Sequence, residues 1–99
     1  MPTYTIDMTD IAEEDLAYYR VFERRMIVNE ILSRLMYEPD AEALGRKILR
    51  ANPLAKWELK LGKYRVFYEI DTVNLSVSII SIGHKEHNVL YVQGKLVKL

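Results

Sequence analysis

Lys60 and Arg65 are two basic residues that a tight hairpin would place side by side. From Trp57 to Ile70, apolar and polar residues alternate on both sides of Gly62-Lys63, which is typical of two half-buried strands joined by a type II′ turn. Such a turn pairs Lys60 with Arg65, with their Cβ atoms about 5 Å apart. Two cations at this distance repel by roughly 1 to 3 kcal/mol, which an anion between them would relieve. The alternative is an ordinary solvated sheet face, because exposed charges interact weakly.

The same register predicts which face of the hairpin is buried. It sets Trp57 opposite Tyr68 and Leu59 opposite Val66, so one face is almost wholly aromatic and aliphatic and must belong to the core. We expect the other face, with the two cations, to stay open. Phe67 lies on that open face and could stack on a nucleic-acid base.

His84 and His87 are the only histidines, and both fall in a predicted loop over residues 83–88. Imidazole titrates nearer neutrality than other side chains, so either could act as a general acid. Two histidines in one exposed loop are also often inert, although loops carry functional groups disproportionately. No set of carboxylates and histidines stands at metal-ligand spacing, so we predict neither a metal nor a cofactor.

Length and composition predict one ordinary globular domain over residues 1–99. The chain has 99 residues, of which 49% are hydrophobic and 28% are charged, enough for a single core. It contains no cysteine, which excludes disulfides, thiolate metal sites and a thiol nucleophile. No apolar run has the length of a membrane span, and no signal peptide is recognisable. We therefore expect a cytoplasmic location.

The net charge is zero, but the charges are unevenly distributed. Residues 1–45 carry ten acids and four bases, whereas residues 46–65 carry seven bases and one acid. A local basic patch is what a polyanion requires, so Arg46, Arg50, Lys56 and Lys63 are candidate RNA contacts. Alternatively, the acidic and basic blocks neutralise each other across the folded domain.

The rest of the chain predicts helices before the hairpin and strands after it. Alternation predicts a first strand near residues 4–8, and apolar stripes over residues 12–19 and 27–36 predict a helical hairpin or one bent helix. Glu13, Glu14 and Asp15 suit the first helical N-terminus. A third short helix could span residues 40–51. Further strands are expected over residues 75–82 and 89–92, before a short basic tail. The order predicts an α+β fold, with two to three N-terminal helices on one face of an antiparallel four- to five-stranded sheet.

The predicted helical pair is followed by LKLGKYRVFYEI over residues 59–70 and by SIISIGHKEHNVLY over residues 78–91. These two stretches, with the helical pair before them, resemble the RelE/ParE toxin superfamily of type II toxin–antitoxin systems. The resemblance covers most of the chain and implies a small fold of two helices against an antiparallel sheet. RelE-like members cut mRNA, usually on the ribosome, whereas ParE-like members poison DNA gyrase and have no nuclease centre.

The resemblance also implies roles for single residues. Arg65 matches the family arginine that contacts the scissile phosphate, and Lys60 matches a lysine of the preceding strand. Lys85 falls where the nucleases have an arginine, and Tyr91 falls at their catalytic tyrosine. The chain departs from the pattern at Glu58, where a lysine is expected, and at Lys85, which lacks the bidentate fork of arginine.

RNA cleavage by a 2′-hydroxyl needs a base, an acid for the leaving oxygen, and cations for the phosphorane. By resemblance, Lys60, Arg65 and Lys85 would supply the charge, and Tyr91 would orient or deprotonate the 2′-hydroxyl. We therefore predict a toxin that is a metal-independent mRNA endoribonuclease, acting alone or on the ribosome, and held inactive by a cognate antitoxin. The alternatives are a ParE-like gyrase inhibitor without nuclease activity and a degenerate member that binds only its antitoxin.

Overall fold

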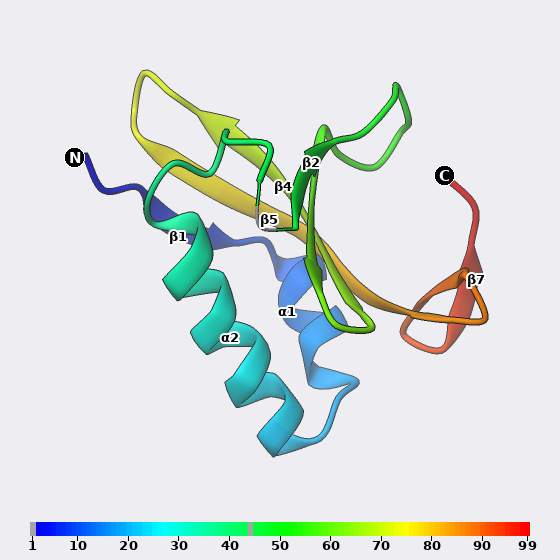
Figure 1. Ribbon diagram of the computed structural model, residues 1–99. Helices are drawn as coiled ribbons and strands as arrows, with labels where there is room; N and C mark the ends of the chain where they lie inside the picture. The colour runs from blue at the N-terminus through cyan, green and yellow to red at the C-terminus, as the bar shows by residue number, and fades with distance from the viewer. Residues whose placement is uncertain (1, 44) are drawn as a thin grey trace.

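A computed structural model describes residues 2–43 and 45–99, which form two helices and one seven-stranded sheet (Figure 1). The sheet order is β2-β3-β4-β5-β6-β7, and β1 pairs with β5 in parallel. The bounds are β1 Thr5–Met8, α1 Asp10–Ala17, α2 Val21–Leu35, β2 Arg46–Ile48, β3 Trp57–Leu61, β4 Tyr64–Asp71, β5 Ser76–Glu86, β6 Val89–Val92 and β7 Lys95–Val97. Neither described helix is long and apolar enough to cross a membrane.

The β3–β4 hairpin has the predicted register. Lys60 pairs with Arg65, and Trp57 pairs with Tyr68. Gly62 has a φ of +59°, which glycine adopts without steric cost and which the first turn position of a type II′ hairpin requires. The local prediction for this central element is therefore confirmed.

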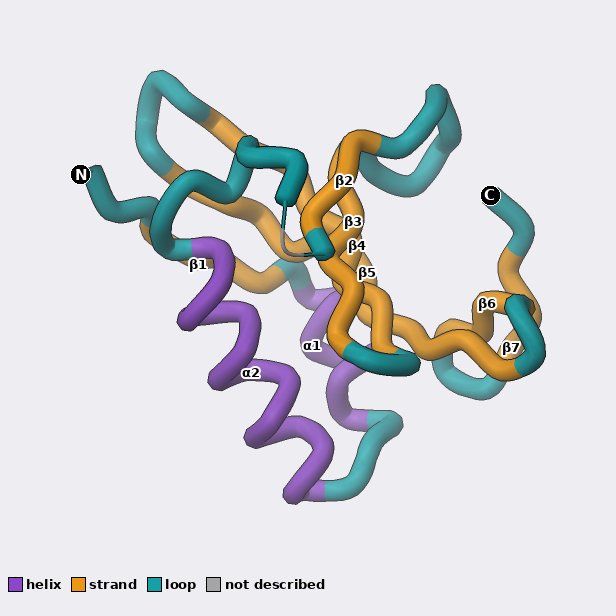
Figure 2. Tube along the Cα trace, in the orientation of Figure 1, coloured by secondary structure: helices purple, strands orange, loops and turns teal. Residues whose placement is uncertain are grey.

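Both helices pack on one face of the sheet, and Figure 2 shows them side by side below it. They form a hairpin and not one bent helix, because α1 ends at Ala17 and α2 begins at Val21. The Thr9 side chain caps α1 by accepting a hydrogen bond from the Ala12 amide. The apolar stripe of α2 is buried with the inward side chains of β3 and β4 in the main core.

The predicted third helix is absent among the described residues of the stretch 40–51. Residues 46–48 instead form β2, antiparallel to β3, and Leu44 lies outside the described residues. The edge of β3 offers unpaired backbone groups, and pairing with them outcompetes a helix too short to be stable alone. The sheet gains β2 on this edge and β7 beyond β6, so it has more strands than predicted.

The prediction of a loop over residues 83–88 is also wrong, because β5 continues to Glu86. Only His87 and Asn88 form the connection to β6, and their φ values are +51° and +64°. Two central residues with positive φ are the mark of a type I′ hairpin turn. This short turn fixes how β6 is registered against β5.

We predicted that the sheet face opposite the helices is open, but part of it is covered. Ala55, Phe67 and Leu90 form a second buried cluster there, with residues of the 49–54 segment and of β6 and β7 packed against it. Phe67 is only 1% exposed. The segment between β2 and β3 and the C-terminal strands thus cover part of the face that carries Arg65.

Candidate functional site

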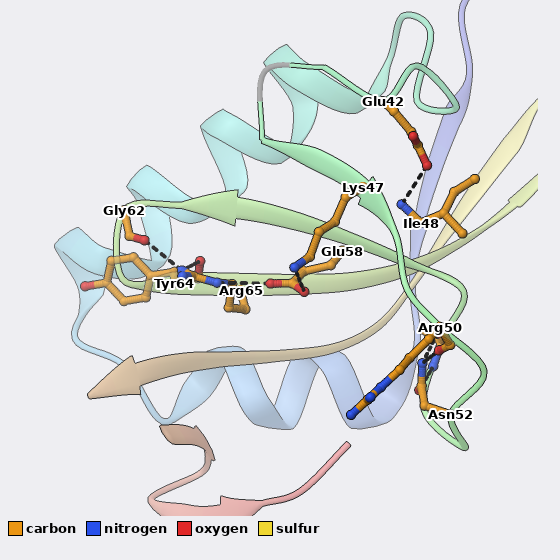
Figure 3. A network of polar contacts seen from close by, with 10 residues as sticks. Glu42, Lys47, Ile48, Arg50, Asn52, Glu58, Gly62, Tyr64 and Arg65 are labelled. Atoms are coloured by element: carbon orange, nitrogen blue, oxygen red, sulfur yellow. Dashed lines mark hydrogen bonds and ion pairs between the residues drawn. The ribbon is translucent and has the colours of Figure 1, made fainter. Parts of the chain in front are cut away.

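Arg65 lies on the sheet face opposite the helices, and the protein itself engages its Nε and Nη1 groups (Figure 3). Its Nε is 3.0 Å from Glu58 Oε1. Its Nη1 donates hydrogen bonds to the carbonyl oxygens of Gly62 at 2.7 Å and Tyr64 at 2.9 Å. The residue is 9% exposed. Arg65 therefore holds a protein carboxylate and does not face an empty surface.

Glu58 is the acid at the centre of this group of cations. It is 4% exposed, and its Oε2 lies 3.8 Å from Lys47 Nζ, which approaches from β2. Lys60 is exposed beside Arg65, and its ammonium has no carboxylate partner among the described residues. The predicted anion between Lys60 and Arg65 is therefore not what the structure has: the carboxylate of Glu58 lies between Arg65 and Lys47.

Lys85 lines a cavity of about 550 Å³ on the same face. Arg50 and Lys98 also line it, and Phe67 and Leu90 contribute apolar wall. Because Phe67 is buried beneath its neighbours, the expectation that it stacks on an RNA base is wrong.

Tyr91 and His84 lie on the helix-covered face of the sheet. His84 pairs with Tyr64 on one side and with Tyr91 on the other, and the rings of His84 and Tyr91 stack with centroids 5.7 Å apart. Residues paired across strands share a face, and neighbours along a strand alternate. Tyr91 therefore faces away from Arg65 and Lys85.

We predicted that His84 lies in an exposed loop, but it is buried in strand β5. Its Nδ1 is 2.7 Å from the Tyr19 hydroxyl, and its Nε2 is 3.4 Å from Glu86 Oε1. Burial raises the pKa of Tyr19 above its ordinary value, so this hydroxyl keeps its proton. His87 lies exposed in the β5–β6 turn, apart from this cluster.

The structure thus divides the predicted catalytic set between two faces. Lys60, Arg65 and Lys85 share one face, whereas His84 and Tyr91 share the other. Lys60 in β3 and Tyr91 in β6 are also separated by three strand spacings, about 14 Å.

The candidate RNA contacts of the basic block differ in whether the protein itself binds their side chains. Arg46 donates hydrogen bonds from Nε to the Ala41 carbonyl and from Nη1 to the Arg34 carbonyl, each at 3.0 Å, so it braces the end of α2. Lys56 and Lys63 are exposed. Lys63 Nζ lies 5.4 Å from the centre of the Tyr64 ring.

Asp15 is a buried polar anchor, whereas the sequence predicted it only as one of the acids near the N-terminus of the first helix. It is 1% exposed and accepts hydrogen bonds from Ser81 Oγ at 2.6 Å, the Ile82 amide at 3.0 Å and Gln93 Nε2 at 2.6 Å. Its spacing from Ala12 and Tyr19, three and four residues away, puts it on the apolar stripe of its helix. That spacing in the sequence indicates that the Asp15 side chain is buried.

The same fold occurs in solved structures of toxin–antitoxin complexes. The toxin–antitoxin complex RelBE2 of Mycobacterium tuberculosis matches with 27% identity and a TM-score of 0.76, covering 86% of this chain and 94% of that one. The archaeal RelE–RelB complex of Pyrococcus horikoshii matches with 21% identity and a TM-score of 0.67, covering 86% and 98%. The intact RelBE complex of E. coli has 23% identity and a TM-score of 0.65, covering 85% and 99%.

Sequence comparison gives the family within this class. The family described as the ParE toxin of type II toxin–antitoxin system, parDE, matches residues 6–89. The chain therefore belongs to the ParE toxin family, within the RelE/ParE superfamily. No curated protein matches the sequence.

Proposed function

We propose that this toxin acts by binding a target protein, with DNA gyrase as the first candidate, and that an antitoxin holds it inactive. The observation that carries the proposal is the buried pair of Arg65 and Glu58, whose charged atoms lie 3.0 Å apart. An arginine that already holds a carboxylate and two backbone carbonyls keeps only its Nη2 group for a phosphate.

The position of the tyrosine supports the same proposal. A general base must come within about 2.6–3.2 Å of the proton that it removes, and the phosphate must meet the cations at the same time. Tyr91 lies on the opposite sheet face from Arg65. To expose Arg65 as well, the protein would have to break a buried ion pair, which costs about 3–5 kcal/mol when one partner is lost.

The second candidate is an endoribonuclease that acts on mRNA, alone or on the ribosome. It is favoured by Lys60 and Lys85, which lie on one face and have no carboxylate partner among the described residues. If the protein is a nuclease, Arg65 would contribute only after it is released from Glu58. The general base would then be a residue on the face of Lys60 and Lys85, and not Tyr91, which lies on the other face.

Two assays on the same purified protein separate the candidates. We expect gyrase supercoiling to fall with added toxin while mRNA stays intact, with and without ribosomes. Arg65→Gln and Lys85→Gln test the nuclease, and Lys95→Gln, in the exposed last strand, is the matched control. Ribosome-stimulated cleavage that is lost in Lys85→Gln and kept in Lys95→Gln, with supercoiling unaffected, would contradict the proposal.

A further inference from the structure

The outer face of the two helices, which points away from the sheet, carries an apolar patch on α2. Four large apolar side chains of this helix are exposed to solvent: Val21, Phe22, Met26 and Leu32. Phe22 is 68% exposed, and Met26 lies four residues further on, so the two side chains are neighbours on one side of the helix. Exposed apolar residues that stand singly are ordinary. Neighbouring ones on one helix indicate a surface that another molecule covers.

Charges of opposite sign lie beside this patch on the two helices. The acids Asp10, Glu13 and Glu14 are exposed on α1, and Arg25 is exposed on α2. None of these four side chains has an ion-pair partner among the described residues. The outer face is therefore acidic along α1, and apolar and basic along α2.

The other charged side chains of α2 are engaged within the chain. The Tyr64 hydroxyl donates to Glu23, Arg24 donates to backbone carbonyls of the α1–α2 connection, and Arg34 pairs with Glu30. Arg25 is thus the cation of α2 that remains available to a partner.

A face with both signs of charge fits a second copy of itself. The helices lie side by side on one face of the sheet (Figure 2). A two-fold axis parallel to them would place α1 of one copy against α2 of the other, and each contact would occur twice. The acids of α1 would then meet the base of α2 on both sides of the axis. A uniformly acidic or uniformly basic partner would instead be repelled by one of the two helices.

The positions of the charges along the helices match this arrangement. Glu13 lies four residues before the end of α1 at Ala17, and Arg25 lies four residues after the start of α2 at Val21. At a rise of about 1.5 Å per residue, both lie about 6 Å from the connection between the helices. A rotation about an axis parallel to the helices preserves this height. Glu13 of one copy therefore comes level with Arg25 of the other.

The apolar contact matches in the same way. Phe22 is the second residue of α2, and Ala17 is the last residue of α1, so the same rotation brings them to nearly the same height. Ala17 is exposed, and its small side chain leaves room for the aromatic ring. The ring of Phe22 can thus pack on the α1 helix of the second copy, beside the pair of charges.

We infer that the outer face of α1 and α2 binds a second copy of the chain and forms a two-fold symmetric dimer. Phe22 and Met26 are buried in it, and Glu13 of each copy pairs with Arg25 of the other. This inference goes beyond the proposed function, because it depends neither on the target of the toxin nor on the antitoxin.

The first experiment is sedimentation velocity of the purified toxin without antitoxin, over concentrations that reach the millimolar level. We expect twice the mass of the chain at high concentration and the single mass on dilution. Phe22→Ser should raise the dissociation constant of the dimer by about tenfold or more, because a central apolar contact is lost. Val73→Ser, at a residue that is 88% exposed in the β4–β5 turn, is the matched control and should leave the constant unchanged.

The second experiment exchanges the charges of the proposed pair. Arg25→Glu and Glu13→Arg should each weaken the dimer by about tenfold, because like charges replace opposite ones at two equivalent places. The variant that carries both changes should associate like the unchanged protein, since each pair is restored with its signs reversed. Lys95→Glu, in the exposed last strand, changes the net charge as much as Arg25→Glu does and should have no effect.

The outcomes separate this inference from the proposed function. A toxin that is folded by circular dichroism and monomeric at every concentration would overturn the dimer, and so would a dimer that Phe22→Ser leaves unchanged. Failure of the double charge exchange to restore association would overturn the two-fold arrangement. A monomeric toxin that loses antitoxin affinity in Phe22→Ser would assign the patch to the antitoxin instead. The supercoiling and RNA assays test the proposed function separately, because neither requires the dimer.

Discussion

At the scale of single residues, Glu58 decides what Arg65 can do. The cross-strand pairing places Lys60 beside Arg65, and the β2 pairing brings Lys47 opposite Glu58. The carboxylate therefore lies between two cations, Arg65 and Lys47, and it occupies the position that an external anion would need beside Arg65. A buried pair of this kind contributes little net stability, but loss of one partner is costly.

Replacing Glu58 should free Arg65 to bind an external anion. We expect Glu58→Gln to lower the free energy of unfolding by about 3 kcal/mol, because Arg65 loses its charged partner, and to make the protein more responsive to sulfate. Sulfate bound by the folded state should then raise stability by about 1.4 kcal/mol for a tenfold excess over its Kd. Thermal unfolding with and without sulfate measures this, and Glu14→Gln, in the exposed part of α1, is the control. Equal sulfate responses in both variants would contradict it.

At the scale of elements, Asp15 ties α1 to the sheet. Its carboxylate accepts hydrogen bonds from β5, through Ser81 and Ile82, and from Gln93 in the β6–β7 turn. Three donors compensate for the burial of a charge that has no ion-pair partner among the described residues, since hydrogen bonds to a carboxylate are stronger than neutral ones. One acid thus joins three parts of the fold that are remote in the sequence.

Asp15→Asn should therefore destabilise the protein although it changes the side chain very little. The amide loses the charge and turns an NH₂ group toward donors, so we expect a loss of about 1.5–3 kcal/mol in the free energy of unfolding. Urea unfolding followed by circular dichroism measures the effect. Asp7→Asn, in the exposed part of β1, should stay within about 0.5 kcal/mol of the unchanged protein. A loss no larger than in this control would show that Asp15 is not an anchor.

At the scale of the whole molecule, the helix layer and the sheet are also joined by a contact that depends on pH. The Tyr64 hydroxyl donates a 2.6 Å hydrogen bond to Glu23 Oε1, which lowers the pKa of Glu23 below its ordinary value, with a further contribution from the Arg20 amide. Burial, together with this same bond, raises the pKa of Tyr64 to about 12. The first turn of α2 is thereby held to the start of β4.

The sign of this pH effect depends on the lowered pKa of Glu23. A carboxyl with a lower pKa in the folded state than in the unfolded chain stabilises the fold above its unfolded pKa, and the contribution is lost as pH falls through the folded value. We therefore expect Glu23→Gln to reduce the drop in melting temperature between about pH 6 and pH 3. Melting curves at the two pH values, with Glu14→Gln as control, test this. An unchanged drop in Glu23→Gln would refute it.

Much of the fold could be predicted because it depends on local signals. The β3–β4 register follows from period-two alternation and from a glycine at the turn, and the two helices follow from their apolar stripes. The short β2 could not be predicted in this way, because it exists only where the edge of β3 is present to pair with it.

The sequence by itself determined that Lys60 and Arg65 are neighbours, and with the family resemblance it predicted a catalytic set that also includes Lys85, Tyr91, His84 and His87. Only the tertiary structure decided which of them share a face. The two-residue turn at His87-Asn88 sets Tyr91 opposite His84, and since side chains alternate along a strand, a register different by one residue would have reversed that face. The ion pair between Glu58 and Arg65 was likewise decided by packing, because burial of that face leaves the guanidinium no better partner than the carboxylate beside it.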